Sequence, residues 1–259
     1  MKKAAEYRII YPINRLRNRD RKAEKMHIKT DAIVLRTYDN GKNSKLLLLL
    51  TREHGRLAAV ARGAASLKSA LCAASGQFCY ASFVLFKQAD RYVVDSADIK
   101  ELFFELRNDV TALSCAQYMA EIAAAVAQEG EGDEELLRVL LNCLYAMTKL
   151  KVSPALCKCV FELRVAACEG YMPDLACENA VGVDFVQGTA VPAFGETVVP
   201  LSPTAMETLG EIFFLPTERI FSFAAAPETQ AELAAFSERY LLSQTDLRPK
   251  TLEFLRTLL

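Results

Sequence analysis

The side chains of this sequence that are best suited to binding chemistry are cations and one aromatic ring near its N-terminal end. Tyr38 lies in a polar segment that we expect to form a loop. The cations around it are Arg36, Lys42, Lys45, Arg52, Arg56, Arg62 and Lys68. Lysine and arginine neutralise phosphate groups, and an aromatic ring can stack on a base. Together these side chains predict a surface that binds nucleic acid, although any one cation alone could be an ordinary solvated charge.

Charge is distributed unevenly along the chain, which its net charge of −1 conceals. Residues 1–25 carry a net charge of +6 and residues 26–104 a net charge of +4, whereas residues 105–259 carry −11. Such an asymmetry indicates an anionic partner for the N-terminal part. The acidic remainder would repel phosphates, so we expect it to contact proteins or to pack on the N-terminal part.

Motifs that indicate catalysis are missing from the sequence. Its two histidines, His27 and His54, have no cysteine or serine motif around them. The sequence contains neither the Gly-x-x-x-x-Gly-Lys-Ser/Thr phosphate loop nor the Gly-x-Ser-x-Gly nucleophile elbow. We therefore expect no catalytic residue, and a binding protein rather than an enzyme.

Most of the eight cysteines lie in apolar periodic segments, where a reduced cysteine acts as a small hydrophobic residue. No secretory signal precedes them, and no apolar run approaches the roughly 18 residues that a membrane span needs. These features predict a reduced protein of the cytoplasm.

The elements that must position the cations are β-strands. Apolar alternation and β-branched runs predict strands over residues 28–36, 45–51, 56–62, 77–86 and 91–96, with a turn at Asn40-Gly41. Five short strands in close succession indicate a small closed barrel, because closure removes exposed strand edges. Phe78, Tyr80 and Phe86 have the same strand parity and could share a face, although most aromatic residues of a small barrel fill its core.

A helical apolar period begins at about Ile99 and continues to the end of the chain. Helix starts are indicated by Asp133, by Ser153-Pro154 and Ser202-Pro203, and by Pro227 and Pro249. The fold class is therefore α+β, with a five-stranded OB-fold barrel over residues 26–100 and a helical domain over residues 101–259. Residues 171–200 are expected to form an irregular or hairpin insertion.

Residues 1–25 differ from the rest, since they are basic and have no sustained apolar face. Their composition favours a disordered extension or a misassigned start, with Met26 as the true start. Two alternatives are a basic arm that adds affinity for nucleic acid and an arginine-rich transit peptide.

Several segments, in order and spacing, resemble the RecO family of recombination mediators. They are residues 30–36 (TDAIVLR), 50–56 (LTREHGR), 61–64 (ARGA) with Lys68-Ser69, 161–164 (FELR), 170–175 (GYMPDL), 201–203 (LSP) and 248–255 (RPKTLEFL). Each motif is weak alone, but the resemblance extends from about residue 28 to residue 257.

The resemblance implies an OB-fold that binds single- and double-stranded DNA and anneals complementary strands. It also implies partners, namely RecR and single-strand-binding protein, and assistance in loading RecA onto DNA coated by that protein. A protein-interaction adaptor of the same pathway, with weak DNA binding of its own, is the alternative.

The sequence departs from the family at its zinc site. Many RecO proteins carry two Cys-x-x-Cys pairs after the Pro-Asp-Leu loop, but here Ala180 follows Cys177 at the second position and no later cysteine exists. Tetrahedral zinc needs four nitrogen or sulfur ligands. Cys157 and Cys159, two residues apart on a predicted helix, would point to different faces. We therefore expect no metal and no other cofactor.

Three cations stand out against the acidic background of the C-terminal part. Arg164, Arg248 and Lys250 could form a basic spot that accepts an acidic tail such as that of single-strand-binding protein. A local salt bridge to Glu162 is the alternative for Arg164, and Glu253 is a comparable partner for the others.

Overall fold

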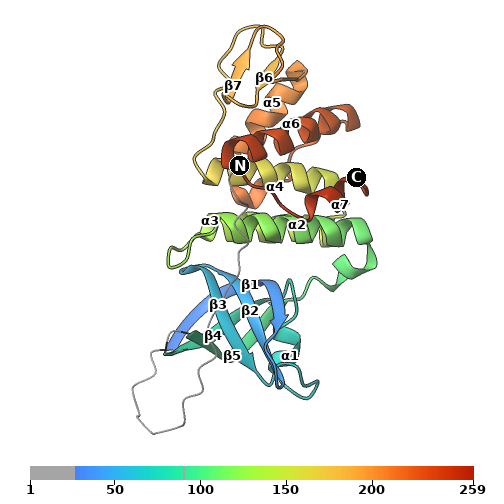
Figure 1. Cartoon of the computed structure of the whole chain (residues 1–259). Helices are drawn as coiled ribbons and strands as arrows, with labels where there is room; N and C mark the ends of the chain where they lie inside the picture. The colour runs from blue at the N-terminus through green and yellow to red at the C-terminus, as the bar shows by residue number, and fades with distance from the viewer. Residues whose placement is uncertain (1–26, 90) are drawn as a thin grey trace, which may run out of the picture.

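The computed structural model describes residues 27–89 and 91–259. The basic extension expected over residues 1–25 lies outside the described residues. Figure 1 shows a β-barrel at one end of the molecule, a helical layer of α2 (Val110–Val126) and α3 (Glu134–Tyr145) against it, and the helices from residue 154 onward stacked beyond that layer.

The first five strands form a closed barrel in the order β1-β2-β3-β5-β4. Their bounds are β1 (His27–Asp39), β2 (Ser44–Thr51), β3 (Gly55–Arg62), β4 (Tyr80–Gln88) and β5 (Arg91–Glu101), with the short helix α1 (Leu71–Ala74) between β3 and β4. The β3–β5 pairing is parallel and the other four are antiparallel. The predicted α+β class and five-stranded OB-fold barrel are confirmed.

Strand alternation explains both faces of the barrel wall. The uninterrupted leucines of β2 alternate in direction: Leu47 and Leu49 fill the barrel interior, whereas Leu50 belongs to the core that the barrel shares with the helices. In β1 the same alternation turns Ile33 and Leu35 outward and Val34 inward, and a β-bulge between Val34 and Arg36 then places Arg36 opposite the outward-facing Leu48. The wall is therefore apolar on its inner face and, in part, on its outer face.

Two strands are longer than the sequence predicted. β1 continues to Asp39, so the prediction that Tyr38 lies in a loop is wrong: this residue pairs with Leu46 within the sheet. β5 continues past Ile99, which pairs with Ala81, so the helical region does not begin there. In both places cross-strand pairing extends the strand beyond the residues that the sequence pattern assigned to it.

Four of the five predicted helix starts are confirmed, but the last helix begins at Leu252 and not at Pro249. Their bounds are α2 (Val110–Val126), α3 (Glu134–Tyr145), α4 (Pro154–Cys168), α5 (Pro203–Phe214), α6 (Pro227–Thr245) and α7 (Leu252–Arg256). Short turns are η1 (Phe104–Asn108), η2 (Ala146–Leu150, a π-helix) and η3 (Thr217–Arg219). The side chains of Asp133, Ser153 and Ser202 accept backbone hydrogen bonds at the starts of α3, α4 and α5. Over the described residues, no helix is both long and apolar enough to cross a membrane.

One apolar core joins the barrel to the helices. Ile33, Leu35 and Leu50 point out of the barrel and are 2% exposed or less, in the same cluster as the buried residues of α2 and α3. Phe78 and Phe103, from the segments that flank β4 and β5, complete this contact. The helical layer therefore covers one part of the outer face of the barrel and leaves the rest open.

A backbone joint fixes one end of this contact. The β2–β3 turn meets the loop between α2 and α3: Arg56 N donates to Gln128 O at 2.9 Å, and Gly130 N donates to His54 O at 3.1 Å. Gly55 has a φ of +59°, and a Cβ at this position would lie 2.1 Å from Gln128 O. Two separate features therefore require glycine at position 55, namely the positive φ angle and the close approach of the Gln128 carbonyl oxygen.

Residues 171–200 contain a three-stranded sheet in the order β7-β6-β8, made of β6 (Gly182–Asp184), β7 (Thr189–Val191) and β8 (Val198–Pro200). Asp184 holds its turns together. Its carboxylate accepts hydrogen bonds from Val186 N at 2.9 Å, Gln187 N at 3.0 Å and Thr197 Oγ1 at 2.7 Å. Gln244 of α6 adds hydrogen bonds to the carbonyl oxygens of Phe185 and Val186.

Replacing Gly55 with alanine should destabilise the protein more than the same change at Gly41. Gly41 also has a positive φ, of +63°, but nothing lies within 4 Å of a Cβ there. We expect a loss of about 1 kcal/mol for Gly41→Ala from the backbone conformation alone, and at least about 2 kcal/mol more for Gly55→Ala from the clash. Urea unfolding of both variants measures the difference, and equal losses would contradict the role of the joint.

Replacing Asp184 with alanine should lower the free energy of unfolding by about 1–2 kcal/mol, because three donors lose their acceptor. The hydrogen bonds of Gln187, Thr197 and Val186 hold the pKa of Asp184 below its usual value. Its contribution is therefore present above the unfolded pKa of about 4 and lost as the pH falls through the folded pKa. The difference in unfolding free energy between wild type and variant should accordingly shrink in acid. A difference that grew in acid would contradict this assignment.

Candidate nucleic-acid interface

The open part of the outer barrel face lies on β1, β2 and β3. The register places Tyr38 beside Leu46 and Leu46 beside Val60, and in the next row it places Arg36 beside Leu48. Leu46, Leu48 and Val60 are half-buried and form an apolar floor. An apolar floor with a ring and a cation at its edge offers a platform for bases beside a contact for phosphate.

Arg36 and Tyr38 act as a pair on this face. The guanidinium carbon of Arg36 lies 5.8 Å from the centre of the Tyr38 ring, and the Tyr38 side chain is 43% exposed. Both residues follow the β-bulge, which returns the side chains of β1 to the register of the apolar floor. The cation–π contact orients the ring without covering it, so its outer surface stays open to a base.

The apolar floor was missed by the reasoning from sequence, which considered only charged and aromatic residues. A signal for it existed in the run Leu46–Leu50. Five consecutive apolar residues in a strand cannot all face the inside of a barrel, because successive side chains alternate in direction. Some of these leucines therefore had to form an apolar outer surface.

Two of the predicted cations face the helical layer instead. Arg52 forms an ion pair with Glu134 at 2.7 Å. Arg56 donates through Nη1 to the carbonyl oxygen of Ala124 at 2.6 Å. Both contacts belong to the joint between the barrel and α2–α3, so these two side chains stabilise the position of the barrel.

The remaining predicted cations lie at the rim of the open face. Lys42 is exposed in the β1–β2 turn, and Lys68 is exposed in the β3–α1 connection. Lys45, the second residue of β2, is half-buried and lies opposite Asp39, with the strand parity of the inward-facing Leu47. Arg62 ends β3 and donates to Gln88, a neutral partner. Within residues 27–89 and 91–259, none of these four forms a salt bridge that would cancel its charge.

The aromatic residues of the barrel are mostly structural. Phe78 and Phe83 are 1% exposed or less, and Phe86 lies beside His27 with ring centres 5.9 Å apart. Tyr80 lies under the ammonium group of Lys100, 5.2 Å from the ring centre, in the region toward the helices. Tyr38 is thus the ring that the open face presents.

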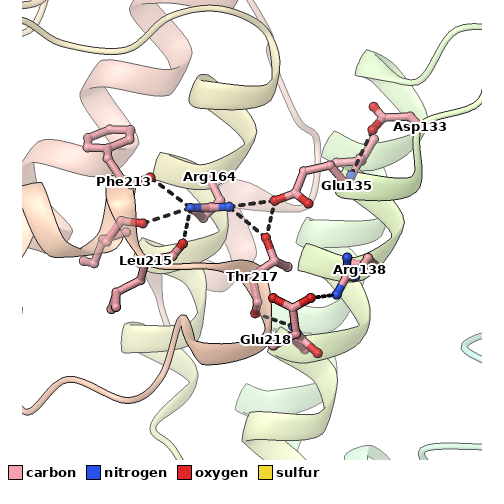
Figure 2. Close-up of polar contacts among 11 residues, drawn as sticks. Asp133, Glu135, Arg138, Arg164, Phe213, Leu215, Thr217 and Glu218 are labelled. Carbon is pink, nitrogen blue, oxygen red and sulfur yellow. Dashed lines mark hydrogen bonds and ion pairs between the residues drawn. The ribbon is translucent and has the colours of Figure 1, made fainter.

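Arg164 is used inside the helical domain (Figure 2). Its Nη1 donates to the carbonyl oxygens of Phe213 and Leu215, both at 3.0 Å, and so caps the end of α5. Its Nη2 contacts Glu135 at 2.6 Å and Thr217 Oγ1 at 2.8 Å. The salt bridge considered with Glu162 is wrong, because that carboxylate is occupied elsewhere and Glu135 of α3 takes its place.

Glu162 is the centre of a second polar network within the helices. Its carboxylate is fully buried and accepts Tyr118 Oη at 2.6 Å and Ser237 Oγ at 2.7 Å. Lys158, one helical turn earlier, contacts Glu162 at 2.8 Å and Glu238 at 2.7 Å. Burial raises the pKa of Glu162, and the lysine and the two hydroxyl groups oppose that rise. The network ties α2, α4 and α6 together.

Arg248 and Lys250 differ from Arg164 because both side chains are exposed. They lie in the segment that precedes α7. Glu121 of α2 binds this segment through hydrogen bonds. The Glu121 carboxylate accepts Lys250 N at 3.0 Å, Thr251 N at 3.0 Å and Thr251 Oγ1 at 2.7 Å.

In the described part of the chain, no group of three or more histidine, cysteine, aspartate or glutamate side chains comes together in a way that could hold a metal ion. Cys157 and Cys159 lie on α4 and are buried in the helical core. Burial raises the pKa of the Cys159 thiol to about 12, which disfavours the thiolate that zinc binds. Asp184 lies in the insertion of residues 171–200, where the sequence lacks the two Cys-x-x-Cys pairs, and its carboxylate holds the turns there by hydrogen bonds.

A closed five-stranded barrel with a basic, partly apolar open face, joined to an acidic helical domain, places the protein in the OB-fold class. The family models agree in detail: residues 26–103 match "Recombination protein O N terminal" and residues 107–253 match "Recombination protein O C terminal". The chain belongs to the RecO family of DNA repair proteins.

Several characterised relatives support this assignment. The chain is 30% identical to the DNA repair protein RecO of Acetivibrio thermocellus over 244 residues, which covers 90% of this chain and 97% of the relative. The DNA repair protein RecO of Alkaliphilus metalliredigens is 37% identical over 150 residues, covering 58% and 61% of the two chains. That of Clostridium kluyveri is 24% identical over 241 residues, covering 89% and 94%.

Replacing Arg164 with lysine should lower the free energy of unfolding by about 2–4 kcal/mol, because one ammonium group cannot satisfy the carbonyl oxygens of Phe213 and Leu215, the Thr217 hydroxyl and the Glu135 carboxylate together. Arg138→Lys is the matched control. Arg138 also pairs with a carboxylate, that of Glu218, but both side chains are well exposed, so we expect a change within about 0.5 kcal/mol. Urea unfolding separates the two, and a neutral Arg164→Lys would show that the network is dispensable.

Proposed function

We propose that this protein is a DNA repair and recombination mediator that binds DNA on the open face of β1, β2 and β3. Single strands bind with bases over the apolar floor and Tyr38, and with phosphates along Arg36 and the rim cations Lys42, Lys45, Arg62 and Lys68. Double strands bind through phosphate contacts alone. The protein acts in the cytoplasm, at the nucleoid, and needs no cofactor.

One observation carries this proposal: whether a cation of the barrel is engaged by another protein group depends on where it lies. Those toward the helices, such as Arg52 and Arg56, are occupied by protein groups. Those around the open face form no salt bridge with a described residue, although the register places Asp39 opposite Lys45. A cluster of exposed, uncompensated cations attracts polyanions and releases their counterions on binding.

Strand annealing follows from the same electrostatics. Two complementary strands repel each other through their phosphates, and a bound cationic surface reduces that repulsion without any energy input. Catalytic residues are not required, in agreement with a mediator rather than an enzyme. Together with RecR, the protein helps to load RecA onto DNA that single-strand-binding protein covers.

The helical domain has the opposite task in this proposal. Its charge of −11 over residues 105–259 repels DNA, so bound strands stay on the barrel. Its surfaces are free to contact RecR and single-strand-binding protein. An adaptor that acts only through such protein contacts, with little DNA affinity of its own, is the competing function.

Binding of a fluorescent oligothymidine to the full chain, measured by anisotropy over a series of salt concentrations, tests the proposal. We expect the affinity to fall steeply with salt, with a log–log slope of about −0.7 for each phosphate that is neutralised. The adaptor function predicts weak binding without such a slope. Annealing of complementary strands, with and without RecR, then distinguishes DNA binding alone from mediation.

Replacing Tyr38 with alanine should weaken binding of single-stranded DNA by about 1–3 kcal/mol, a loss of roughly 5- to 150-fold, because a stacking surface is removed. Tyr38→Phe keeps the ring and should bind like the wild type. Binding of duplex DNA should change little in both variants, since paired bases are not available for stacking. Equal affinities of the alanine and phenylalanine variants for single strands would exclude Tyr38 as a stacking platform.

A further inference from the structure

We propose that Leu67, in the β3–α1 connection, inserts between two neighbouring bases of a bound single strand at the end of the open face. The inference rests on the proposed function, since it adds a base contact to the same DNA-binding site. Leu67 is 93% exposed, a value that no other large hydrophobic residue in the described part of the chain reaches. A leucine that packs against so little of its own fold gains from an apolar partner, and the faces of the bases are apolar surfaces of a nucleic acid.

The topology of the barrel places Leu67 beyond the last row of the open face. β2 runs from the β1–β2 turn to the β2–β3 turn, and the second of these turns meets the helices at the joint around Gly55. Since β2 has eight residues, about 25 Å separate its two ends. β3 returns along β2, so Arg62 at its end lies opposite Ser44. The connection that follows Arg62 therefore starts at the end of the barrel away from the joint, next to the row of Tyr38.

Hydrogen bonds hold the connection around Leu67 in two consecutive turns. Ser66 N donates to Gly63 O at 3.0 Å, and Ser69 N donates to Ser66 O at 2.9 Å. Leu67 is the second residue of the second turn, a corner position at which the side chain meets solvent. Because the backbone is already ordered there, little entropy is lost when the side chain contacts a ligand.

The connection is also attached to the hairpin that carries the open face. Ala65 N donates to Asn43 O, in the β1–β2 turn, at 3.5 Å. Beyond α1, Ser75 O accepts a hydrogen bond from Thr37 Oγ1 of β1 at 2.8 Å. Thr37 precedes Tyr38, so the strand that presents the ring also holds the far end of the connection. Leu67 and the open face therefore keep a fixed relation to each other.

The charges around Leu67 favour a polyanion as its partner. Lys68 follows it in sequence, Lys42 lies in the turn that Ala65 contacts, and Arg62 ends the strand before it. These three cations are exposed and form no salt bridge with a described residue. A single strand supplies phosphates for the cations and base faces for the leucine in one molecule. Proteins that part the base steps of DNA use apolar side chains of this kind.

Insertion costs least in a single strand. There only the stacking of two bases is lost, whereas a duplex step must also be bent or unpaired. The open face holds bases over Tyr38 and the apolar floor, and a wedge at the end of that face keeps the next step apart. Bases that are unstacked present their pairing edges, which the annealing of complementary strands requires.

The fluorescence of 2-aminopurine tests the inference, because stacking on neighbouring bases quenches it and a leucine does not. The probe is an oligodeoxyadenosine with one 2-aminopurine, to which the full chain is added. We expect the fluorescence to rise when the wild type binds. Leu67→Ala should remove most of the rise and weaken binding roughly 5- to 10-fold, since three carbon atoms lose about half of their burial.

Two further variants serve as controls. Leu67→Met keeps an apolar side chain of similar volume and should behave like the wild type. Leu259→Ala makes the same replacement at a leucine that is 53% exposed and follows α7, and it should also behave like the wild type. Thermal unfolding should be unchanged in all variants, because the replaced side chains contribute little to the core.

The outcomes separate the inference from the proposed function. If the wild type does not bind the probe, the proposed function fails. If it binds without a rise in fluorescence, or with the same rise and affinity in Leu67→Ala, this inference fails instead. A weaker affinity of Leu67→Ala with an unchanged rise would also overturn it, because the leucine would then touch the strand without entering it. Unchanged behaviour toward DNA with a reduced affinity for purified RecR would overturn it in favour of a protein contact.

Discussion

The contact between the outer face of the barrel and α2–α3 is the constraint on which the rest of the structure depends. A closed barrel normally hides its apolar residues inside, but this one also turns Ile33, Leu35 and Leu50 outward. Each fully buried side chain of this size contributes about 1.5–3 kcal/mol, so the barrel and the helices gain substantially from staying together. The backbone joint at Gly55 and Gly132 fixes their orientation, because neither position leaves room for a Cβ. The two parts therefore share one core and present one fixed surface.

That fixed contact determines which cations are available. A cation at the joint is neutralised by the helices, as Arg56 shows with the carbonyl oxygen of Ala124. A cation beyond the joint, such as Lys42 or Lys68, is exposed and forms no salt bridge with a described residue. Cations in the helical domain are neutralised in the same way, since Lys158 forms an ion pair with Glu162 and Arg164 forms one with Glu135. Buried ion pairs of this kind add little net stability, but losing one partner is costly, so they fix the arrangement of the helices.

The sequence allowed the barrel, the order of the helices and most helix starts to be predicted, because alternation, period and caps are local signals. The boundaries that failed depend on partners distant in sequence. Tyr38 seemed to belong to a polar turn, yet its pairing with Leu46 extends β1. Arg52 and Arg56 looked like binding residues, since no local pattern reveals that Glu134 and Ala124 will face them. Arg164 likewise takes its carboxylate from α3 and not from its own helix, where Lys158 already binds Glu162.

The loss of the zinc ligands fits the same physical reasoning. A metal site holds a small loop by replacing many weak contacts with a few strong ones, and its removal requires another source of order. Here the three acceptor contacts of Asp184 close the turns, and Gln244 attaches them to α6. Gly188 lets the loop approach Tyr240, whose hydroxyl would lie 3.0 Å from a Cβ at that position. The ion pair between Lys158 and Glu238 in turn fixes α6 to α4, so the loop is held in place by its attachment to the helical core.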